Sequence, residues 1–192
     1  MSDKALLIQE PQSESKDLID VLSSIGYDDI RVVGSSEDAN RHASDYEPDV
    51  VLIDVYRPRT KLLKMIADTV EERPVPVIMF VEESSDGMIS DVIKCGVSAY
   101  VVDGYQRNRV RSIVNLARAR FDEHQRLKNE LEDTRSALND RKLIDRAKGI
   151  VMKQKNCDED TAYKLMRKMA MDKNSRIIDV AKQLIDLVDL MQ

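Results

Sequence analysis

A chain of 192 residues with 42% hydrophobic and 34% charged residues can form one large or two small domains around real cores. No apolar run approaches the roughly 20 residues of a membrane span, and the N-terminus lacks the basic start and apolar stretch of a signal peptide. Cys95 and Cys157 stand far apart outside any motif, which predicts reduced thiols and no disulfide or metal site. We therefore expect a cytoplasmic protein that has no cofactor and does not contact a membrane.

The net charge of −5 hides an asymmetry along the chain. Residues 1–140 hold 18 basic against 27 acidic residues, whereas residues 141–192 hold 12 against 8. Opposite charge balance in two parts of a chain indicates separate roles, and a basic module attached to an acidic one is compatible with nucleic-acid binding at the basic end. The alternative is a solvated charged surface without a ligand.

Short apolar runs alternate with amphipathic stretches over the first 118 residues. Strands are predicted at 5–8, 30–33, 50–53, 75–81 and 99–102, and helices at 18–25, 62–70, 88–93 and from 110 onward. Runs rich in β-branched residues are typical of strands buried on both faces, so the pattern predicts a five-stranded parallel sheet in an α/β domain. Ligand chemistry in such a sheet gathers at the carboxyl ends of the strands.

Beyond residue 117 the apolar spacing changes to alternate steps of three and four. The residues at this spacing are His124, Leu127, Leu131, Thr134 and Leu138, and no Gly or Pro occurs between 105 and 148. The pattern predicts a long helix with a thin apolar seam, which favours a coiled-coil homodimer. Packing of the seam on the protein's own domain remains the alternative. We expect three parts: a domain at 1–118, a linker helix at 119–141 and an all-α module at 142–192.

Three helices are predicted in the C-terminal module. The long helix continues to about Lys155 and ends at Asn156 in the left-handed conformation. Asp158 caps the next helix, and Asn174 or Ser175 caps the third, which runs to about Leu190. Apolar residues at helical spacing, including Met152, Met166, Met169 and Met171, are expected to form its core, and Tyr163 is expected to pack rather than to stack on a base.

The residues that connect these patterns to a known family lie between 144 and 185. Ala147-Lys148-Gly149 with Met152, Ala162, Leu165-Met166-Arg167, Ala170-Met171 and Val180-Ala181 resembles the ANTAR domain, the RNA-binding module of AmiR/NasT-type regulators. Residues 96–104 resemble the NasT branch, and residues 5–118 resemble a flavodoxin-like response-regulator receiver. The resemblance implies transcription antitermination by binding of tandem hairpins in leader mRNA, for nitrate and nitrite assimilation genes, and implies a nitrate-sensing protein partner.

Small and basic residues of this module are the candidates for RNA contact: Ala147, Lys148, Gly149, Arg167, Lys168 and Arg176. Arg and Lys on a helical face can bind the phosphates and unstacked bases of an RNA loop. Small neighbours of Lys148 would allow close approach of the backbone to a ligand, although close helix packing explains them equally well. Three small helices can also imitate a DNA-binding helix-turn-helix, which is a competing interpretation.

The receiver-like domain departs from a phosphorylatable one at three places: the acidic pair, the hydroxyl position and the lysine position. Asp54 stands where the phosphate acceptor would be, but the acidic pair reads Gln9-Glu10, the hydroxyl position reads Val81 and the lysine position reads Asp103. These changes remove a carboxylate for Mg²⁺ and the cation that pairs with a phosphoryl group. We therefore expect a pseudo-receiver in which Asp54 is not phosphorylated, and a phosphorylation-activated regulator is the alternative.

Control by a protein partner follows from that expectation. We place the sensor's docking face near residues 100–106, with Tyr105 as its test residue. An enzyme is not expected, because the sequence contains no P-loop, no Ser-His-Asp arrangement and only two histidines, His42 and His124.

Overall fold

The computed structural model describes residues 3–10, 16–35 and 39–189, which divide into two compact units, 1–125 and 126–192. The first unit contains a five-stranded parallel sheet in the order β2-β1-β3-β4-β5. The strands are β1 (Lys4–Gln9), β2 (Asp29–Gly34), β3 (Val50–Val55), β4 (Val77–Val81) and β5 (Ala99–Val102). The predicted α/β fold with a parallel sheet is confirmed.

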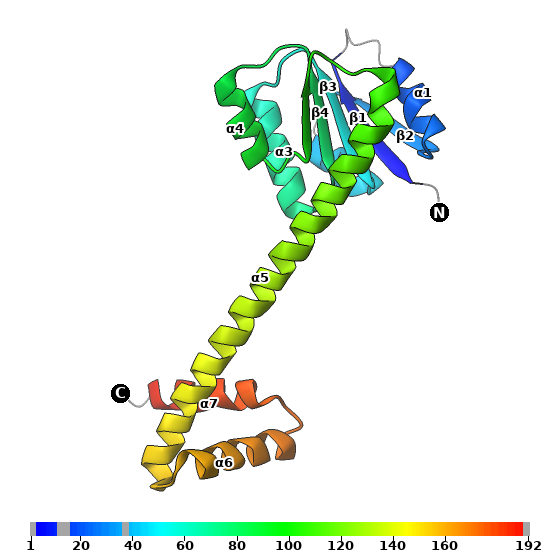
Figure 1. Cartoon of the computed structure of the whole chain (residues 1–192). Coiled ribbons are helices and arrows are strands. Elements are labelled where there is room, and N and C mark those ends of the chain that lie inside the picture. Colours follow the sequence, from blue (N-terminus) through cyan, green and yellow to red (C-terminus); the bar gives the residue numbers. More distant parts are fainter. Residues whose placement is uncertain (1–2, 11–15, 36–38, 190–192) are drawn as a thin grey trace. The chain divides into compact units, whose positions relative to one another are not determined.

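Helices cover both faces of this sheet, as Figure 1 shows. Side chains of α2 (Ala39–Tyr46), α3 (Thr60–Glu72) and α4 (Asp86–Lys94) form one core with alternate strand residues such as Leu6, Ile8 and Ile53. Side chains of α1 (Lys16–Ser24) and of the start of α5 (Arg107–Lys155) form the other core with Leu7 and Leu52. Successive strand residues point to opposite faces, so continuous apolar runs supply both cores.

Two details of the first unit differ from the sequence-based prediction. β4 begins at Val77 rather than at residue 75, because Pro76 has no N–H to donate within the sheet. The helix α2, for which no bounds were predicted, carries His42 and packs Ala43 and Tyr46 against the sheet. Short and interrupted by polar residues, α2 gives a weak periodic signal.

Arginine side chains attach the first turns of α5 to the rest of the first unit. Arg118 donates to Asp3 over 2.8 Å and to the hydroxyl of Tyr27 over 3.2 Å. Arg111 donates to the backbone oxygen of Ser24 over 3.0 Å. Both predicted domain boundaries, 118 and 141, lie inside the continuous helix α5, and they stay predictions.

The predicted seam lies on α5, and its three leucines belong to the second unit. Leu127, Leu131 and Leu138 are 51%, 51% and 55% exposed, so they remain available to a partner. Within the described residues, no helix combines the length and the apolarity that a membrane span needs.

Three helices pack together in the second unit: the end of α5, α6 (Glu159–Asp172) and α7 (Ile177–Asp189). Asn156 ends α5 with a φ of 46°, as predicted. The side chain of Asp158 caps α6 by accepting from the backbone N–H of Thr161 over 2.8 Å, also as predicted. The predicted end of α7 at Leu190 lies outside the described residues.

The predicted cap of α7 is wrong. Asn174 has a φ of 47° and terminates α6, where its N–H donates to Met171 O and the N–H of Ser175 donates to Ala170 O. These two bonds form a Schellman motif. The hydroxyl of Ser175 is buried without a hydrogen-bond partner among the described residues. Asp179 supports α7 instead, because its carboxylate accepts from the backbone N–H of Arg176 over 3.2 Å.

Candidate nucleic-acid interface

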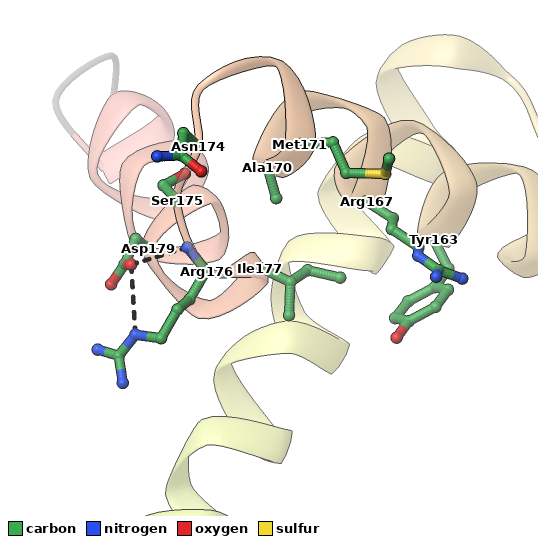
Figure 2. Close-up of a pocket in the computed structure, with 9 residues that line it drawn as sticks. All are labelled: Tyr163, Arg167, Ala170, Met171, Asn174, Ser175, Arg176, Ile177 and Asp179. Atoms are coloured by element: carbon green, nitrogen blue, oxygen red, sulfur yellow. Dashed lines mark hydrogen bonds and ion pairs between the residues drawn. The ribbon is translucent and has the colours of Figure 1, made fainter.

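An open groove of about 770 Å³ lies between α6 and the start of α7. Figure 2 shows its two ends, with Tyr163 and Arg167 on α6 at one and Arg176 with Asp179 at the other. Its remaining lining residues are Ala170, Met171, Asn174, Ser175 and Ile177. We call these nine residues the α6–α7 groove. It combines an aromatic ring, two guanidinium groups and an apolar floor.

The spacing of residues on α6 explains why Tyr163 and Arg167 lie together. They are four residues apart, so they occupy neighbouring turns on one face of the helix. Tyr163 is 43% exposed, which contradicts the prediction that it packs. Arg167 is exposed and has no hydrogen-bond or ion-pair partner among the described residues. A planar ring and a free cation are therefore both accessible from the groove.

The other end of the groove is held by the turn between α6 and α7. The Schellman motif reverses the chain at Asn174, and Arg176 follows two residues later. Besides the backbone contact, Arg176 Nε lies 3.5 Å from Asp179 Oδ2. This exposed pair orients the guanidinium group of Arg176 without burying it.

Lys148 is oriented by two carboxylates rather than presented to solvent. Its Nζ atom lies 2.7 Å from Asp145 Oδ1 and 2.5 Å from Glu159 Oε1, and its side chain is only 15% exposed. Hydrogen bonds to Asp145 and then to Glu159 raise the pKa of the Lys148 ammonium group. The sequence predicts that Lys148 contacts RNA, whereas in the structure its ammonium group is already paired with two carboxylates.

The two small neighbours of Lys148 differ from each other. Ala147 is fully buried in the core of the second unit, so its side chain is not available for the predicted RNA contact. An added Cβ at Gly149 would meet no atom within 4 Å, so close helix packing does not explain this glycine. Gly149 keeps an open backbone surface on α5.

Comparison with protein families identifies the second unit. Residues 132–185 match the family model of the ANTAR domain. These residues are an ANTAR domain. The α6–α7 groove, Lys148 and Gly149 all lie within it.

Two relatives of this chain are regulatory proteins. The chain is 25% identical over 183 residues to the transcriptional regulatory protein PdtaR of Mycobacterium tuberculosis, an alignment that covers 95% of this chain and 89% of that protein. It is 37% identical over 75 residues to the nitrate regulatory protein of Klebsiella oxytoca, which covers 39% of this chain and 19% of that protein.

Solved structures that resemble this chain show the fold of the first unit. The signal receiver domain of a modulated diguanylate cyclase from Desulfovibrio desulfuricans matches with a TM-score of 0.52 and 17% identity, covering 63% of this chain and 97% of that chain. Chemotaxis protein CheY4 of Vibrio cholerae matches with a TM-score of 0.51 and 17% identity, covering 60% of this chain and 98% of that chain. A receiver fold therefore precedes the ANTAR domain.

Lys168 and the four methionines of the ANTAR domain lie in different surroundings. Lys168 is exposed on α6 and does not line the groove. Met166 is fully buried and Met152 packs against the core, as predicted. Met169 and Met171 are 36% and 72% exposed, so the prediction that they belong to the core is wrong, and Met171 lines the groove instead.

The receiver fold brings the predicted pocket residues to one edge of its sheet. Gln9 and Asp54 are partners across β1 and β3, and the N–H of Gly104, which follows Asp103, donates to Val81 O over 2.9 Å. Asp54 is 7% exposed and Val81 is fully buried.

The described side chains Gln9, Glu10, Asp54 and Asp103 bring oxygen atoms to this edge of the sheet. The side-chain oxygen of Gln9 is buried without a partner among the described residues, and Glu10 Oε2 accepts from the N–H of Tyr56 over 3.3 Å. Asp103 is exposed with a φ of 66°. In the described ranges, no group of three or more His, Cys, Asp or Glu residues is placed to hold a metal ion.

The proposed sensor face contains both packed and exposed residues. Tyr105 packs edge-to-face on Phe80 with ring centroids 5.8 Å apart, and the hydroxyl of Tyr100 donates to Ser84 Oγ over 2.8 Å. Val102 is 38% exposed and Gln106 is exposed. Substitution of Tyr105 would disturb the core, so Val102 and Gln106 are better test residues.

Proposed function

We propose that this protein is a transcription antitermination regulator that binds hairpin loops in leader mRNA through the α6–α7 groove. The observation that carries the proposal is an exposed Tyr163 with unpaired Arg167 beside it and Arg176 across an apolar floor. RNA loops expose unstacked bases, which stack on aromatic rings and guanidinium planes. Phosphates on either side of such a base would reach the two arginines.

A nitrate-related target is the finer part of the proposal. The nitrate regulatory protein of Klebsiella oxytoca shares 37% identity over 75 residues with this chain. The sequence resemblance to the NasT branch points to the same pathway. The proposed targets are therefore leader transcripts of nitrate and nitrite assimilation genes.

Control by a protein, rather than by phosphorylation, is supported by the receiver pocket. Val81 offers no hydroxyl, and Asp103 stands where a lysine would pair with the phosphoryl group. A carboxylate at that place repels a phosphorylated Asp54. We place a nitrate-sensing partner on the face that exposes Val102 and Gln106, where it would withhold the protein from RNA.

Homodimerisation through α5 fits both the seam and a target with two hairpins. Three half-exposed leucines, Leu127, Leu131 and Leu138, follow a coiled-coil spacing. Analytical ultracentrifugation of a variant with all three leucines changed to Asn tests this step. A monomer is expected where the unchanged chain sediments as a dimer, and identical sedimentation contradicts the proposal.

Binding of the full chain to a two-hairpin leader RNA tests the central step. Arg167→Gln is expected to weaken binding about tenfold through loss of one charged contact. Lys142→Gln is the matched control, because Lys142 is exposed in the same unit and does not line the groove. An equal loss of RNA affinity in both variants would show that binding is nonspecific and electrostatic. Stronger binding to duplex DNA than to the hairpins would favour the helix-turn-helix interpretation.

A further inference from the structure

Basic residues gather at one place in the acidic receiver domain, the loop from β3 to α3 and the first turns of α3. Residues 56–64 read Tyr-Arg-Pro-Arg-Thr-Lys-Leu-Leu-Lys, with four basic residues and no acidic one. The two leucines and Pro58 are buried, whereas the basic side chains are exposed. We call the exposed basic residues the basic loop patch: Arg57, Arg59, Lys61 and Lys64.

A pocket of about 630 Å³ opens at this patch. It is lined by Glu10, Tyr56, Arg57, Pro58, Arg59 and Thr60. Tyr56 is 54% exposed and is fixed at both ends, because its N–H donates to Glu10 Oε2 over 3.3 Å and its hydroxyl donates to Glu83 Oε1 over 2.5 Å. Its ring is therefore held in place at the surface.

The basic side chains of the patch form no ion pairs with described residues of the protein. Across the described residues, none of the four has a hydrogen bond or an ion pair from its side chain. Other arginines of the same unit do have acidic partners: Arg73 pairs with Glu47, Arg107 with Asp17 and Arg118 with Asp3. In a domain rich in carboxylates, four unpaired cations, two of which line a pocket with a fixed aromatic ring, mark a surface for an anionic partner.

We propose that the basic loop patch binds single-stranded RNA, namely the unpaired transcript beside the hairpins. The patch repeats the chemistry of the α6–α7 groove, an exposed tyrosine with two arginines, on the other unit of the chain. An aromatic ring beside guanidinium groups stacks bases and binds phosphates together. An acidic peptide would use the cations but would leave the ring unused. The identity of the transcript rests on the proposed function.

The test uses the full chain and two RNAs, the hairpins alone and the hairpins with an unpaired extension on each side. The unchanged chain is expected to bind the extended RNA about tenfold more tightly. Arg57→Gln/Arg59→Gln is expected to remove this difference while binding to the hairpins alone stays the same. Loss of two phosphate contacts would also make the binding constant for the extended RNA less dependent on salt. The slope of its logarithm against the logarithm of salt concentration would become less steep by roughly 1.4.

The matched control is Arg109→Gln/Arg120→Gln, two exposed arginines of the same unit outside the pocket. The control should keep the preference for the extended RNA. Retention of that preference by the patch variant overturns this inference and leaves the proposed function standing. No binding of the unchanged chain to either RNA overturns both. Unchanged RNA binding together with lost binding of a protein partner assigns the patch to that partner and overturns the RNA role.

Discussion

The ammonium nitrogen of Lys148 on α5 lies 2.5 Å from a carboxylate oxygen of Glu159 in the first turn of α6. A second carboxylate, from Asp145 one turn earlier on α5, lies 2.7 Å away. These contacts connect the two helices at the capped start of α6, where Tyr163 and Arg167 follow Glu159 one and two turns later on the same helix. These contacts support a positioning role for Lys148, which joins α5 to α6.

Lys148→Met should destabilise the ANTAR domain. The substitution removes the connection between α5 and α6 and leaves two carboxylates without their cation, so we expect the free energy of unfolding to fall by about 1 kcal/mol. Chemical denaturation followed by circular dichroism measures the change. Lys142→Met, on an exposed part of the same helix, serves as the control, and an equal effect of both variants would contradict the positioning role.

The stability difference between the unchanged chain and Lys148→Met should depend on pH, because two pKa values are shifted in the folded protein. Hydrogen bonding to Lys148 lowers the pKa of Asp145 from its ordinary value of 3.8, so this contribution is present above 3.8 and is lost as pH falls through the folded value. The raised pKa of Lys148 makes its contribution present below 10.5 and lost as pH rises through the folded value. Unfolding measured from pH 3 to 11 should show the largest gap between the unchanged chain and Lys148→Met at neutral pH. A gap that widens below pH 4 would contradict the pairing.

Two methionines of α6 should respond very differently to truncation. Met166 is fully buried, so Met166→Ala should cost about 2–5 kcal/mol of stability. Met171 is 72% exposed, so Met171→Ala should change stability by less than about 0.5 kcal/mol. Thermal unfolding of both variants checks the contrast, and similar melting temperatures would show that α6 packs with another face.

Periodicity and strand-like runs were enough to predict the receiver sheet, because the strands β1, β3 and β4 are buried on both faces and leave a continuous apolar signal. Local residue preferences were enough for Asn156 and Asp158, because a left-handed helix end and a helix N-cap depend on neighbours in sequence. Residue preferences alone could not decide whether Asn174 ends α6 or caps α7, because Asn is favourable at both helix ends.

The candidate interface was harder to predict, because burial and pairing of its side chains depend on residues that are distant in sequence. Ala147 and Lys148 are adjacent, yet one is in the core and the other is held by Glu159 eleven residues later. Tyr163 was expected to pack, since a helix pattern does not show where the neighbouring helix ends. The groove exists because the turn at Asn174 leaves one side of α6 uncovered.

Phosphorylation of Asp54 should not occur. Incubation with a small phosphodonor and Mg²⁺ is expected to produce no mass increase, because Asp103 supplies a negative charge where the phosphoryl group needs a cation. Intact-mass spectrometry gives the readout, with a phosphorylatable receiver as positive control. A mass increase that disappears in Asp54→Asn would establish the phosphorylation-activated alternative.

The most direct test of the account is a fluorescence titration of the full chain with the two-hairpin RNA near physiological salt, comparing Tyr163→Leu with Tyr163→Phe. Loss of stacking on one base should weaken binding by roughly 1–3 kcal/mol for Tyr163→Leu, while Tyr163→Phe should retain the affinity of the unchanged chain. Equal affinity of all three proteins, or no preference for the native loops over scrambled loops on the same stems, would contradict RNA recognition in the α6–α7 groove.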